Sequence, residues 1–251
     1  MTSLLSRLAF RFARPILRLH FWLYSRNVDR AFFPEDEPEG VVGGPDPERI
    51  LFVGDIAVAG YGVLRHGMSA ASYTAAAIGQ RTGRGVTWST LTAFDLTAHR
   101  VATLPCHDTY DFSRVVFMIG IPDVLLATDA GAWGRDLRTV FARARESFGP
   151  DTQIVFAGIP PMHEFQPIPR LARLLIKERI DQLNATAMAV LEEDRSDAGS
   201  VFVVTPDWRE GHAYVQESFS WKKLHHLWGT TIGSAAAGSS RSPVGGAPIA
   251  A

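Results

Sequence analysis

Five short apolar runs alternate with helix-forming segments, and this alternation restricts the folds open to the chain more than any other feature. The runs are residues 50–53, 85–88, 115–121, 153–159 and 200–204. They are rich in β-branched residues and do not alternate strictly between apolar and polar positions, which is typical of parallel strands buried on both faces. Strands that alternate with helices predict an α/β fold, here a three-layer αβα sandwich around a five-stranded parallel sheet.

The segments between these runs carry helical periodicity. We predict helices near residues 68–82, 132–148, 169–194 and 217–232. The third is the longest, and its apolar positions indicate a stripe that faces the core. The residues of this stripe are Leu171, Leu174, Leu175, Ile180, Leu183, Met188 and Leu191.

Composition divides the chain into four parts. Residues 1–30 are predicted to form a basic amphipathic helix, 31–48 an acidic Pro/Gly-rich linker, 49–232 the α/β domain, and 233–251 a disordered tail. The net charge is 25 − 26 = −1, which excludes a protein that binds nucleic acid through its overall charge. A single cysteine excludes an intramolecular disulfide framework.

The first 28 residues contain five arginines and no acidic residue. Arg7, Arg11, Arg14 and Arg18 fall within an arc of roughly 60° on a helix, opposite a broad apolar face. One interpretation is a helix that lies in an anionic membrane surface. The other is a helix that packs its apolar face onto the domain and leaves the arginines in solvent. Because arginines interrupt the apolar runs, we expect neither a signal peptide nor a transmembrane helix, and therefore a cytoplasmic protein, peripheral at the membrane under the first interpretation.

Polar residues follow several of the predicted strands, at the positions where open parallel sheets bind ligands. Asp55, Asp95 and Asp123 follow three strands, and His163 follows a fourth. Carboxylate oxygens suit a hard cation such as Mg²⁺, but we expect no metal site and no cofactor. Two further arrangements offer a nucleophile: the contiguous Cys106-His107-Asp108, and Ser69 or Ser220 paired with a distant histidine. The histidines available for this pairing are His66, His163, His212, His225 and His226.

Four motifs recur in a defined order along the chain. Residues 50–63 run from an apolar strand through Gly54-Asp55-Ile56 into a Gly-rich turn. The other motifs are Gly120-Ile121-Pro122-Asp123, Gly158-Ile159-Pro160-Pro161-Met162 and residues 219–228. In order and spacing they resemble the sequence blocks of the SGNH, or GDSL-type, hydrolase family, the third in a form seen in one bacterial branch. The resemblance covers residues 48–232 and implies a flavodoxin-like αβα fold.

The four residues that give that family its name are replaced in this chain. The nucleophilic serine corresponds to Ile56, the oxyanion-hole glycine falls on or beside Asp95, and the oxyanion-hole asparagine corresponds to Pro122. The histidine base aligns, in a loose register, with Ser220. Isoleucine has no nucleophilic atom, and proline has neither an N–H nor a side-chain amide that stabilises an oxyanion. The resemblance therefore implies the fold of a serine esterase without its catalytic residues.

We expect a degenerate SGNH-type protein, a pseudoenzyme that binds an acyl-bearing small molecule, a membrane or a protein partner. The expected ligand-binding residues are Asp55, Ile56, Asp95, Pro122, Asp123, Pro161, Met162 and His163. One alternative is a divergent hydrolase or acyl-transfer enzyme that acts on ester or acyl substrates through replacement residues such as Asp95 or His163. Another is a structural role in which the pocket is filled.

Overall fold

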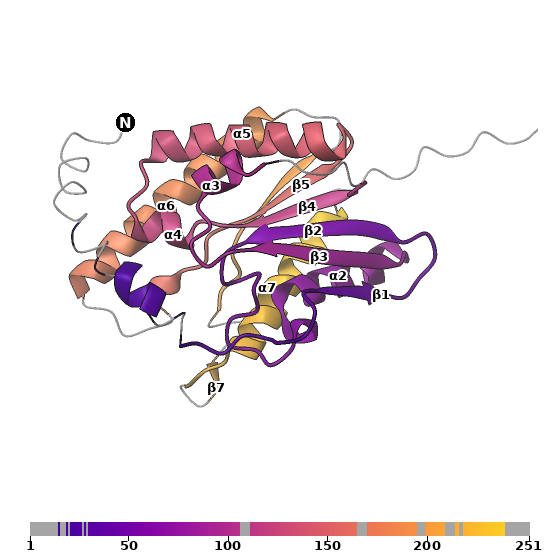
Figure 1. The fold of residues 1–251 in the computed structure, drawn as a ribbon, viewed down its shortest axis with the longest axis horizontal. Coiled ribbons are helices and arrows are strands. Elements are labelled where there is room, and N and C mark those ends of the chain that lie inside the picture. The colour runs from indigo at the N-terminus through magenta and orange to yellow at the C-terminus, as the bar shows by residue number, and fades with distance from the viewer. Residues whose placement is uncertain are drawn as a thin grey trace, which may run out of the picture.

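The computed structural model describes residues 15, 19, 21–26, 28, 30–105, 111–164, 170–194, 199–208, 214–215 and 218–238. These residues form three layers, with a twisted sheet between two layers of helices (Figure 1). The six strands of this sheet lie in the order β1-β3-β2-β4-β5-β6. Their bounds are β1 Glu39–Val42, β2 Glu48–Gly54, β3 Val86–Thr92, β4 Arg114–Met118, β5 Gln153–Ala157 and β6 Ser200–Val203. The five predicted strands are confirmed, and they pair parallel with one another as predicted.

Strand β1 makes the sheet six-stranded and mixed, where five parallel strands were predicted. It lies inside residues 31–48, which the sequence indicated as a linker, and pairs antiparallel with β3 from Glu39↔Ser89 to Val42↔Val86. Val42 packs against the core while Val41 is exposed. The acidic Pro/Gly-rich flanks concealed this short edge strand, because only four residues carry the strand pattern.

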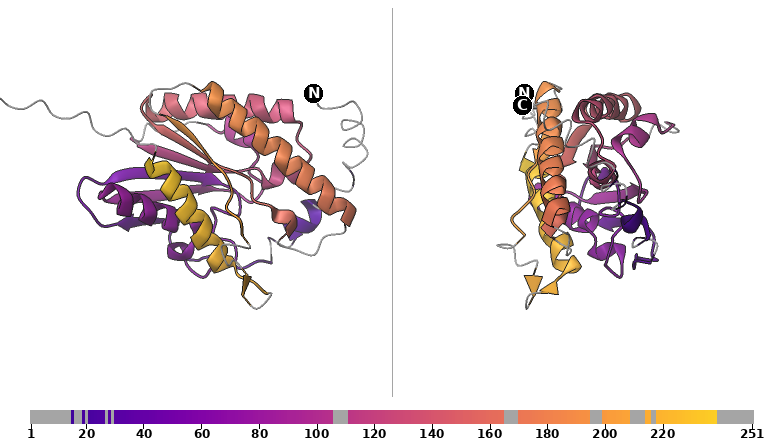
Figure 2. Two further views of the ribbon diagram at one scale, coloured as in Figure 1. Left: turned by 180° about the vertical axis from the view of Figure 1, so that it is seen from behind. Right: turned by 90° about the vertical axis from the view of Figure 1, so that its left-hand side faces the viewer.

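Helices cover both faces of the sheet (Figure 2). Helices α2 (Ala70–Thr82) and α7 (Trp221–Gly238) pack on one face, and α5 (Ala130–Phe148) and α6 (Arg170–Glu193) pack on the other. Two short helices, α3 (Ala98–Thr103) and α4 (Ile121–Leu125), also belong to this second face. The four predicted helices are therefore present, whereas α3 and α4 were not predicted. Helix α7 also extends six residues into the segment predicted to be a disordered tail.

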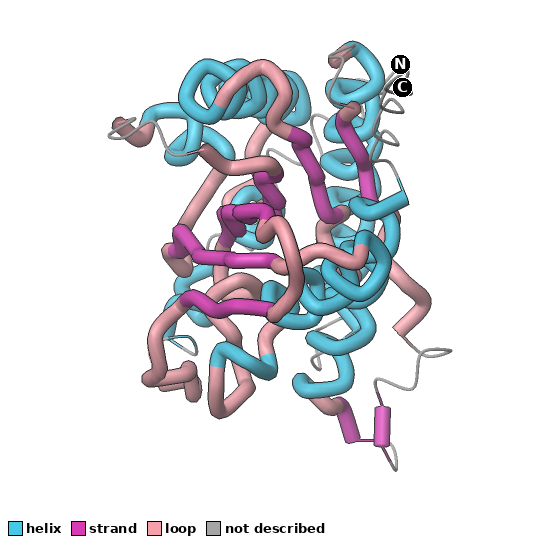
Figure 3. The backbone as a smooth tube through the Cα atoms, turned by 90° about the vertical axis from the view of Figure 1, so that its right-hand side faces the viewer, coloured by secondary structure: helices cyan, strands magenta, loops and turns pink. Residues whose placement is uncertain are grey.

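Three smaller elements lie at the ends of the longer ones. The 3₁₀ helices η1 (His66–Met68) and η2 (Met162–Glu164) precede α2 and α6. The strands β7 (Tyr214–Val215) and β8 (Ser218–Phe219) form a separate antiparallel pair just before α7. Figure 3 shows this pair set apart from the main sheet.

Helices α2 and α7 approach each other closely because glycine stands at two contact positions. A Cβ atom at Gly229 would lie 2.5 Å from the carbonyl oxygen of Ala70, and one at Gly233 would lie 2.6 Å from that of Thr74. The Thr74 hydroxyl donates a hydrogen bond to the Gly229 carbonyl at 3.1 Å. The two helices thus pack almost backbone to backbone over the sheet.

The core stripe of α6 differs from the predicted one. Leu171, Leu174 and Met188 are exposed by 62%, 65% and 38%, so the prediction that they face the core was wrong. The buried residues of this helix are Ala172, Ile176, Arg179, Ile180, Leu183, Ala187, Val190 and Leu191. Successive buried positions are mostly three or four residues apart, which defines one helical face. The exposed leucines lie off this face.

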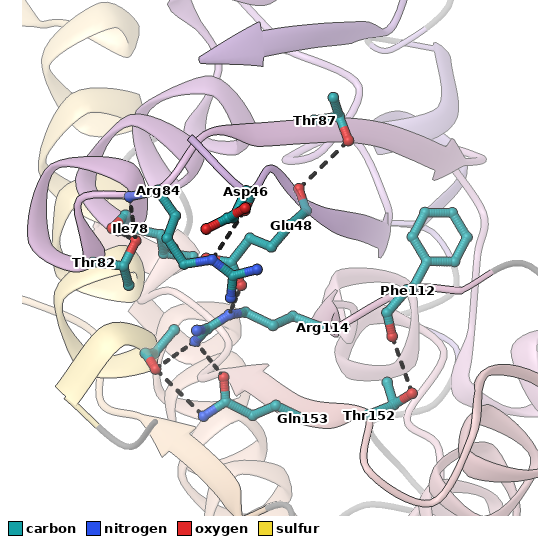
Figure 4. Close-up of polar contacts among 11 residues, drawn as sticks. Asp46, Glu48, Ile78, Thr82, Arg84, Thr87, Phe112, Arg114, Thr152 and Gln153 are labelled. Atoms are coloured by element: carbon teal, nitrogen blue, oxygen red, sulfur yellow. Dashed lines mark hydrogen bonds and ion pairs between the residues drawn. The ribbon is translucent and has the colours of Figure 1, made fainter. Parts of the chain in front are cut away.

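A buried polar cluster joins the amino ends of three strands to α7 (Figure 4). Arg114 Nε donates to Glu48 Oε2 at 2.8 Å. One terminal nitrogen of Arg114 donates to Gln153 Oε1 at 2.5 Å and to the Ala236 carbonyl at 2.7 Å. The side chains of Arg114 and Glu48 are only 7% and 1% exposed. Within the described part of the chain, Glu48 Oε1 has no hydrogen-bond partner, so the charge of Glu48 depends on Arg114 for its compensation.

No helix among the residues that the structure describes is both long enough and apolar enough to cross a membrane.

Candidate functional site

Three loops meet at the carboxyl end of the sheet. The Ala93 amide donates to the Gly54 carbonyl, and the Ile121 amide donates to Asp55 Oδ2 at 3.1 Å. These bonds connect the loops that follow the adjacent strands β3, β2 and β4. The structure therefore places Ile56, Asp95 and Pro122 on neighbouring segments that hydrogen bonds connect, Pro122 in the first turn of α4.

Asp55 holds two of these loops together from inside the protein. Its Oδ1 accepts a hydrogen bond from the Ala57 amide at 3.2 Å, while Oδ2 accepts from the Ile121 amide. The residue is 1% exposed. Burial raises the pKa of Asp55 to about 7, an effect only partly offset by the two amide hydrogen bonds. Asp55 thus braces the loops, and both of its oxygens are engaged.

Asp123 has a similar role in α4, the short helix that follows the neighbouring strand β4. Its Oδ2 accepts from the Ala98 amide at 3.0 Å, and its Oδ1 accepts from the Thr128 hydroxyl at 2.8 Å. Burial raises the pKa of Asp123 to about 6, and the amide hydrogen bond from Ala98 acts in the opposite direction. The carboxyl group therefore connects α3 to the loop that follows α4.

Ile56 is buried, and the N-terminal segment packs as a cover on the apolar cluster that contains it. Ile56 is 9% exposed and belongs to the same apolar cluster as Val28. Phe21 and Tyr24 pack against this cluster, and the Tyr24 hydroxyl donates to the Phe94 carbonyl at 3.1 Å. Burial, with smaller contributions from nearby charges that include Asp55, raises the pKa of Tyr24. The sequence offered packing of the N-terminal helix on the domain as one interpretation, but not its place, because no local pattern connects residues 21–28 to the loop after β3.

The N-terminal segment is described only at some of its residues. Residues 21–26 are helical, and Phe21, Tyr24 and Val28 direct their side chains toward the domain. Arg7, Arg11, Arg14 and Arg18 lie outside the described residues, so the predicted arginine arc stays a prediction.

Asp95 and Pro122 differ in how they face the site. Asp95 is partly exposed and forms an ion pair with Arg100 on α3, so its charge is balanced on the outer side of the loop. Pro122 is buried in the first turn of α4, directly after Gly120 and Ile121. A proline there supplies no N–H to the space beside Ile56.

The loop after β5 brings Pro161, Met162 and His163 to the same end of the sheet. Met162 packs against the apolar cluster that contains Ile56, and Pro161 is half-buried. His163 Nε2 lies 3.8 Å from Glu164 Oε1, while Nδ1 is buried with no hydrogen-bond partner among the described residues. Burial lowers the pKa of His163, which favours the neutral imidazole.

The two serines proposed as displaced nucleophiles both cap helices. Ser69 Oγ accepts from the Ser72 amide at 3.3 Å, and Ser220 Oγ accepts from the Lys223 amide at 3.4 Å. Across the described ranges, no hydrogen bond joins a serine hydroxyl to a histidine ring, and His66 instead pairs with Asp36 at 3.0 Å. Cys106-His107-Asp108 and His212 lie outside the described residues. Within the part of the chain that is described, no group of three or more His, Cys, Asp or Glu side chains is arranged to hold a metal ion.

Comparison with known proteins identifies the family. Residues 52–225 match the sequence profile of the GDSL-like lipase/acylhydrolase family. The chain belongs to this family. The resemblance of the four motifs is thereby confirmed. Comparison with curated proteins gave no match.

Solved structures show the fold expected of a GDSL-like protein. An extracellular lipase from Streptomyces rimosus is 14% identical, with a TM-score of 0.51 over 75% of this chain and 99% of the other. A carbohydrate esterase family 3 protein from Talaromyces cellulolyticus is 10% identical, with a TM-score of 0.52 over 74% and 94%. A phospholipase A1 from Streptomyces albidoflavus NA297 is 13% identical, with a TM-score of 0.50 over 75% and 99%. At these identities the likeness concerns the fold alone.

The family match of this GDSL-like chain ends at His225, five residues beyond Ser220. His225 is 1% exposed, accepts a hydrogen bond from the Ala70 amide at 3.1 Å through Nδ1, and lies 2.9 Å from the Tyr61 carbonyl through Nε2. Nε2 must therefore carry the proton. Burial lowers the pKa of His225 to about 4. Both nitrogens are occupied, so the ring ties α7 to the start of α2 and to the loop after β2.

Proposed function

We propose that this GDSL-like protein is catalytically inactive and binds an acyl-bearing ligand at the carboxyl end of its sheet. The observation that carries the proposal is Ile56, which directly follows the Gly54-Asp55 turn and is buried in the apolar cluster on which Phe21 and Tyr24 pack. An isoleucine in this place forms no acyl-enzyme.

The surroundings of Ile56 support the loss of oxyanion stabilisation as well. Pro122 offers no N–H, and the loss of a single oxyanion donor typically lowers the rate by about 10²–10³. Asp95 places a carboxylate on the adjacent loop, although its ion pair with Arg100 balances the charge. With no nucleophile at Ile56 and no donor from Pro122, hydrolysis by acyl transfer to a serine has no starting point.

The same substitutions make the site suited to an apolar ligand. Ile56, Leu96 and Ile121 are buried in one cluster, and Tyr61 and Met162 pack against it. Sites that bind small molecules combine such apolar walls with a few polar groups. An acyl chain would reach these walls when Phe21 and Tyr24 move away, so the N-terminal segment would act as a cover for the ligand.

The second candidate function is a divergent hydrolase or acyl-transfer enzyme. His163 favours it, since a buried and neutral imidazole nitrogen without a partner is chemically suited to accept a proton. The structure gives His163 no hydrogen bond to a serine within the described residues. We therefore rank this candidate second.

The two functions are separated by activity assays on the full chain. The protein is incubated with p-nitrophenyl acetate and p-nitrophenyl octanoate, and separately with a fluorophosphonate probe. We expect neither turnover nor labelling above the buffer control, and we expect the same for Ile56→Ser, because Pro122 is unchanged. Turnover by the native chain, lost in His163→Gln, would establish the divergent enzyme in place of the binding protein.

Ligand binding is tested with a fluorescent fatty acid. We expect saturable binding by the native chain that weakens in Ile56→Glu, which places a charge among the apolar walls. As a matched control, Val41→Glu adds the same charge at an exposed position of β1. Equal binding by both variants, with both folded by circular dichroism, would show that the ligand does not use the site at Ile56.

A further inference from the structure

Exposed apolar side chains gather at one end of the molecule. Twelve large apolar side chains are exposed among the described residues. Two of them, Val41 and Met188, lie in β1 and late in α6. The other ten lie in the N-terminal segment, in loops at the carboxyl end of the sheet, at the end of β3 or at the start of α6: Leu19, Trp22, Leu23, Phe32, Leu64, Leu91, Phe94, Leu171, Leu174 and Val204. The end that carries the candidate site is therefore also the most apolar end of the surface.

Helix α6 projects beyond the sheet at this end. Asn184 marks the point where it leaves the sheet, since its side chain exchanges two hydrogen bonds with the backbone of Ile159, just after β5, at 2.8 and 3.1 Å. Leu171 precedes Asn184 by 13 residues, which corresponds to about 20 Å of helix. Figure 1 shows the first turns of α6 at the same end of the molecule as the indigo helix that contains residues 21–26.

The N-terminal helix presents a second apolar side to solvent. Leu19, Trp22 and Leu23 are 57%, 51% and 42% exposed, and their spacing places them on one face. The opposite face carries Phe21 and Tyr24, which pack on the domain. Because only the face with Phe21 and Tyr24 packs on the domain, the other apolar face of this helix is available to a binding partner.

Basic side chains surround these exposed apolar residues. The Arg26 guanidinium lies over the ring of Trp22, 4.9 Å from its centroid. Arg170 and Arg173 are exposed beside Leu171 and Leu174, and the first turn of α6 contains no acidic residue. The sequence adds Arg7, Arg11, Arg14 and Arg18, which lie outside the described residues. Tryptophan and leucine set among arginines match an interface that has anionic head groups above an apolar interior.

We propose that the N-terminal helix and the first turns of α6 form one surface that docks on an anionic lipid bilayer. This surface consists of Leu19, Trp22, Leu23, Arg26, Arg170, Leu171, Arg173 and Leu174. The inference rests on the proposed function in that docking would present the acyl-binding site to its ligand at the membrane. An anionic bilayer complements this surface in two ways: its head groups carry the negative charge that arginines bind, and its interior is apolar like the leucines and Trp22.

The first test is co-sedimentation of the full chain with vesicles of phosphatidylcholine and phosphatidylglycerol. We expect binding to these vesicles that weakens in high salt, and little binding to phosphatidylcholine alone. Leu171→Ser/Leu174→Ser should weaken binding by about tenfold or more. Met188→Ser changes an exposed residue of the same helix outside the surface and should leave binding unchanged. Unaltered binding by the double variant, or an equal loss in Met188→Ser, would overturn the proposal.

The second test uses Trp22 as an internal reporter. The chain has six tryptophans, and Trp22 is the exposed one, since four others are buried and Trp221 is half-buried. Bromine-labelled lipids should quench tryptophan fluorescence in the native chain, and Trp22→Phe should abolish most of this quenching. Quenching that persists in Trp22→Phe would refute the surface as drawn.

Different experimental results would refute the docking surface and the proposed function. Ester turnover would overturn catalytic inactivity and leave vesicle binding as it is. Fatty-acid binding in solution without vesicle binding would refute the docking surface and leave the ligand site intact.

Discussion

Replacement of Arg114 by methionine should destabilise the protein strongly, because it leaves Glu48 charged and buried. Glu48 is 1% exposed in its side chain, its Oε2 accepts from Arg114, and its Oε1 has no other partner in the described structure (Figure 4). Removal of one partner from a buried ion pair typically costs about 3–5 kcal/mol. Total stabilities are about 5–15 kcal/mol, so the variant would lose a large share of its free energy of unfolding.

The pair can be replaced with much less damage if both charges are removed together. In Glu48→Leu/Arg114→Met no buried charge is left, and what is lost is the donor to Gln153 Oε1 and one of the two donors to the Ala236 carbonyl. One unsatisfied buried acceptor costs about 1–3 kcal/mol. We therefore expect the double variant to be more stable than Arg114→Met alone.

Urea denaturation followed by circular dichroism measures these differences. With slopes of about 1–3 kcal/mol per molar urea, Arg114→Met should lower the midpoint by about 1–5 M. Arg84→Met is the matched control, since Arg84 is exposed and its side chain bonds the Asp46 carbonyl at 2.9 Å (Figure 4). The reasoning is refuted if Arg114→Met loses no more stability than Arg84→Met, or if the double variant is as unstable as Arg114→Met.

Three further predictions concern packing and titration. Gly229→Ala should destabilise the protein by about 1–3 kcal/mol in urea denaturation, because its Cβ would meet the Ala70 carbonyl at 2.5 Å; an unchanged midpoint would show that α7 shifts freely. The pKa of Asp123 is raised from 3.8 to about 6, so the folded state holds a proton that the unfolded state releases, and stability should fall as pH rises through this window. Asp123→Asn retains both hydrogen bonds, because the Thr128 hydroxyl can reverse its role, and stability curves measured from pH 4 to 7 should show a smaller fall than in the native chain. The pKa of His225 is lowered from 6.5 to about 4, so stability should instead be lost through this group as pH drops from 6.5 to 4, and His225→Gln should lack that loss; identical pH slopes for native chain and variant would contradict the buried neutral ring.

The central sheet could be predicted because its signal is local. Each of the five parallel strands contains a short apolar run. The alternation of these strands with helices along the chain then predicts helices on both faces of the sheet. Strand β1 has only four residues between acidic and Pro/Gly-rich flanks, so its pairing with β3 depends on tertiary contact. The core stripe of α6 failed for a different reason: Leu171 and Leu174 lie off the buried face of the helix, where the small Ala172 occupies the core position.

The sequence indicated which segments meet at the candidate site, but it did not indicate the side chains and contacts that surround them. Strand ends bring Ile56 and Pro122 to neighbouring loops, which the motif order anticipates. The outward ion pair of Asp95 with Arg100 depends on α3, a helix of six residues that was not predicted. The cover formed by Tyr24 requires a contact between residues 70 positions apart, and no pattern within either segment indicates it.

The packing of α7 on α2 has a consequence for how the protein is made. Thr74 bonds Gly229 across 155 positions of sequence, and α7 covers the face of the sheet that carries Phe52, Val116 and Val155. During synthesis the ribosome delivers every strand of the sheet before this last helix emerges. Until then one side of the nascent sheet has no complete apolar covering, so the interval before α7 docks is when the chain most needs protection from aggregation.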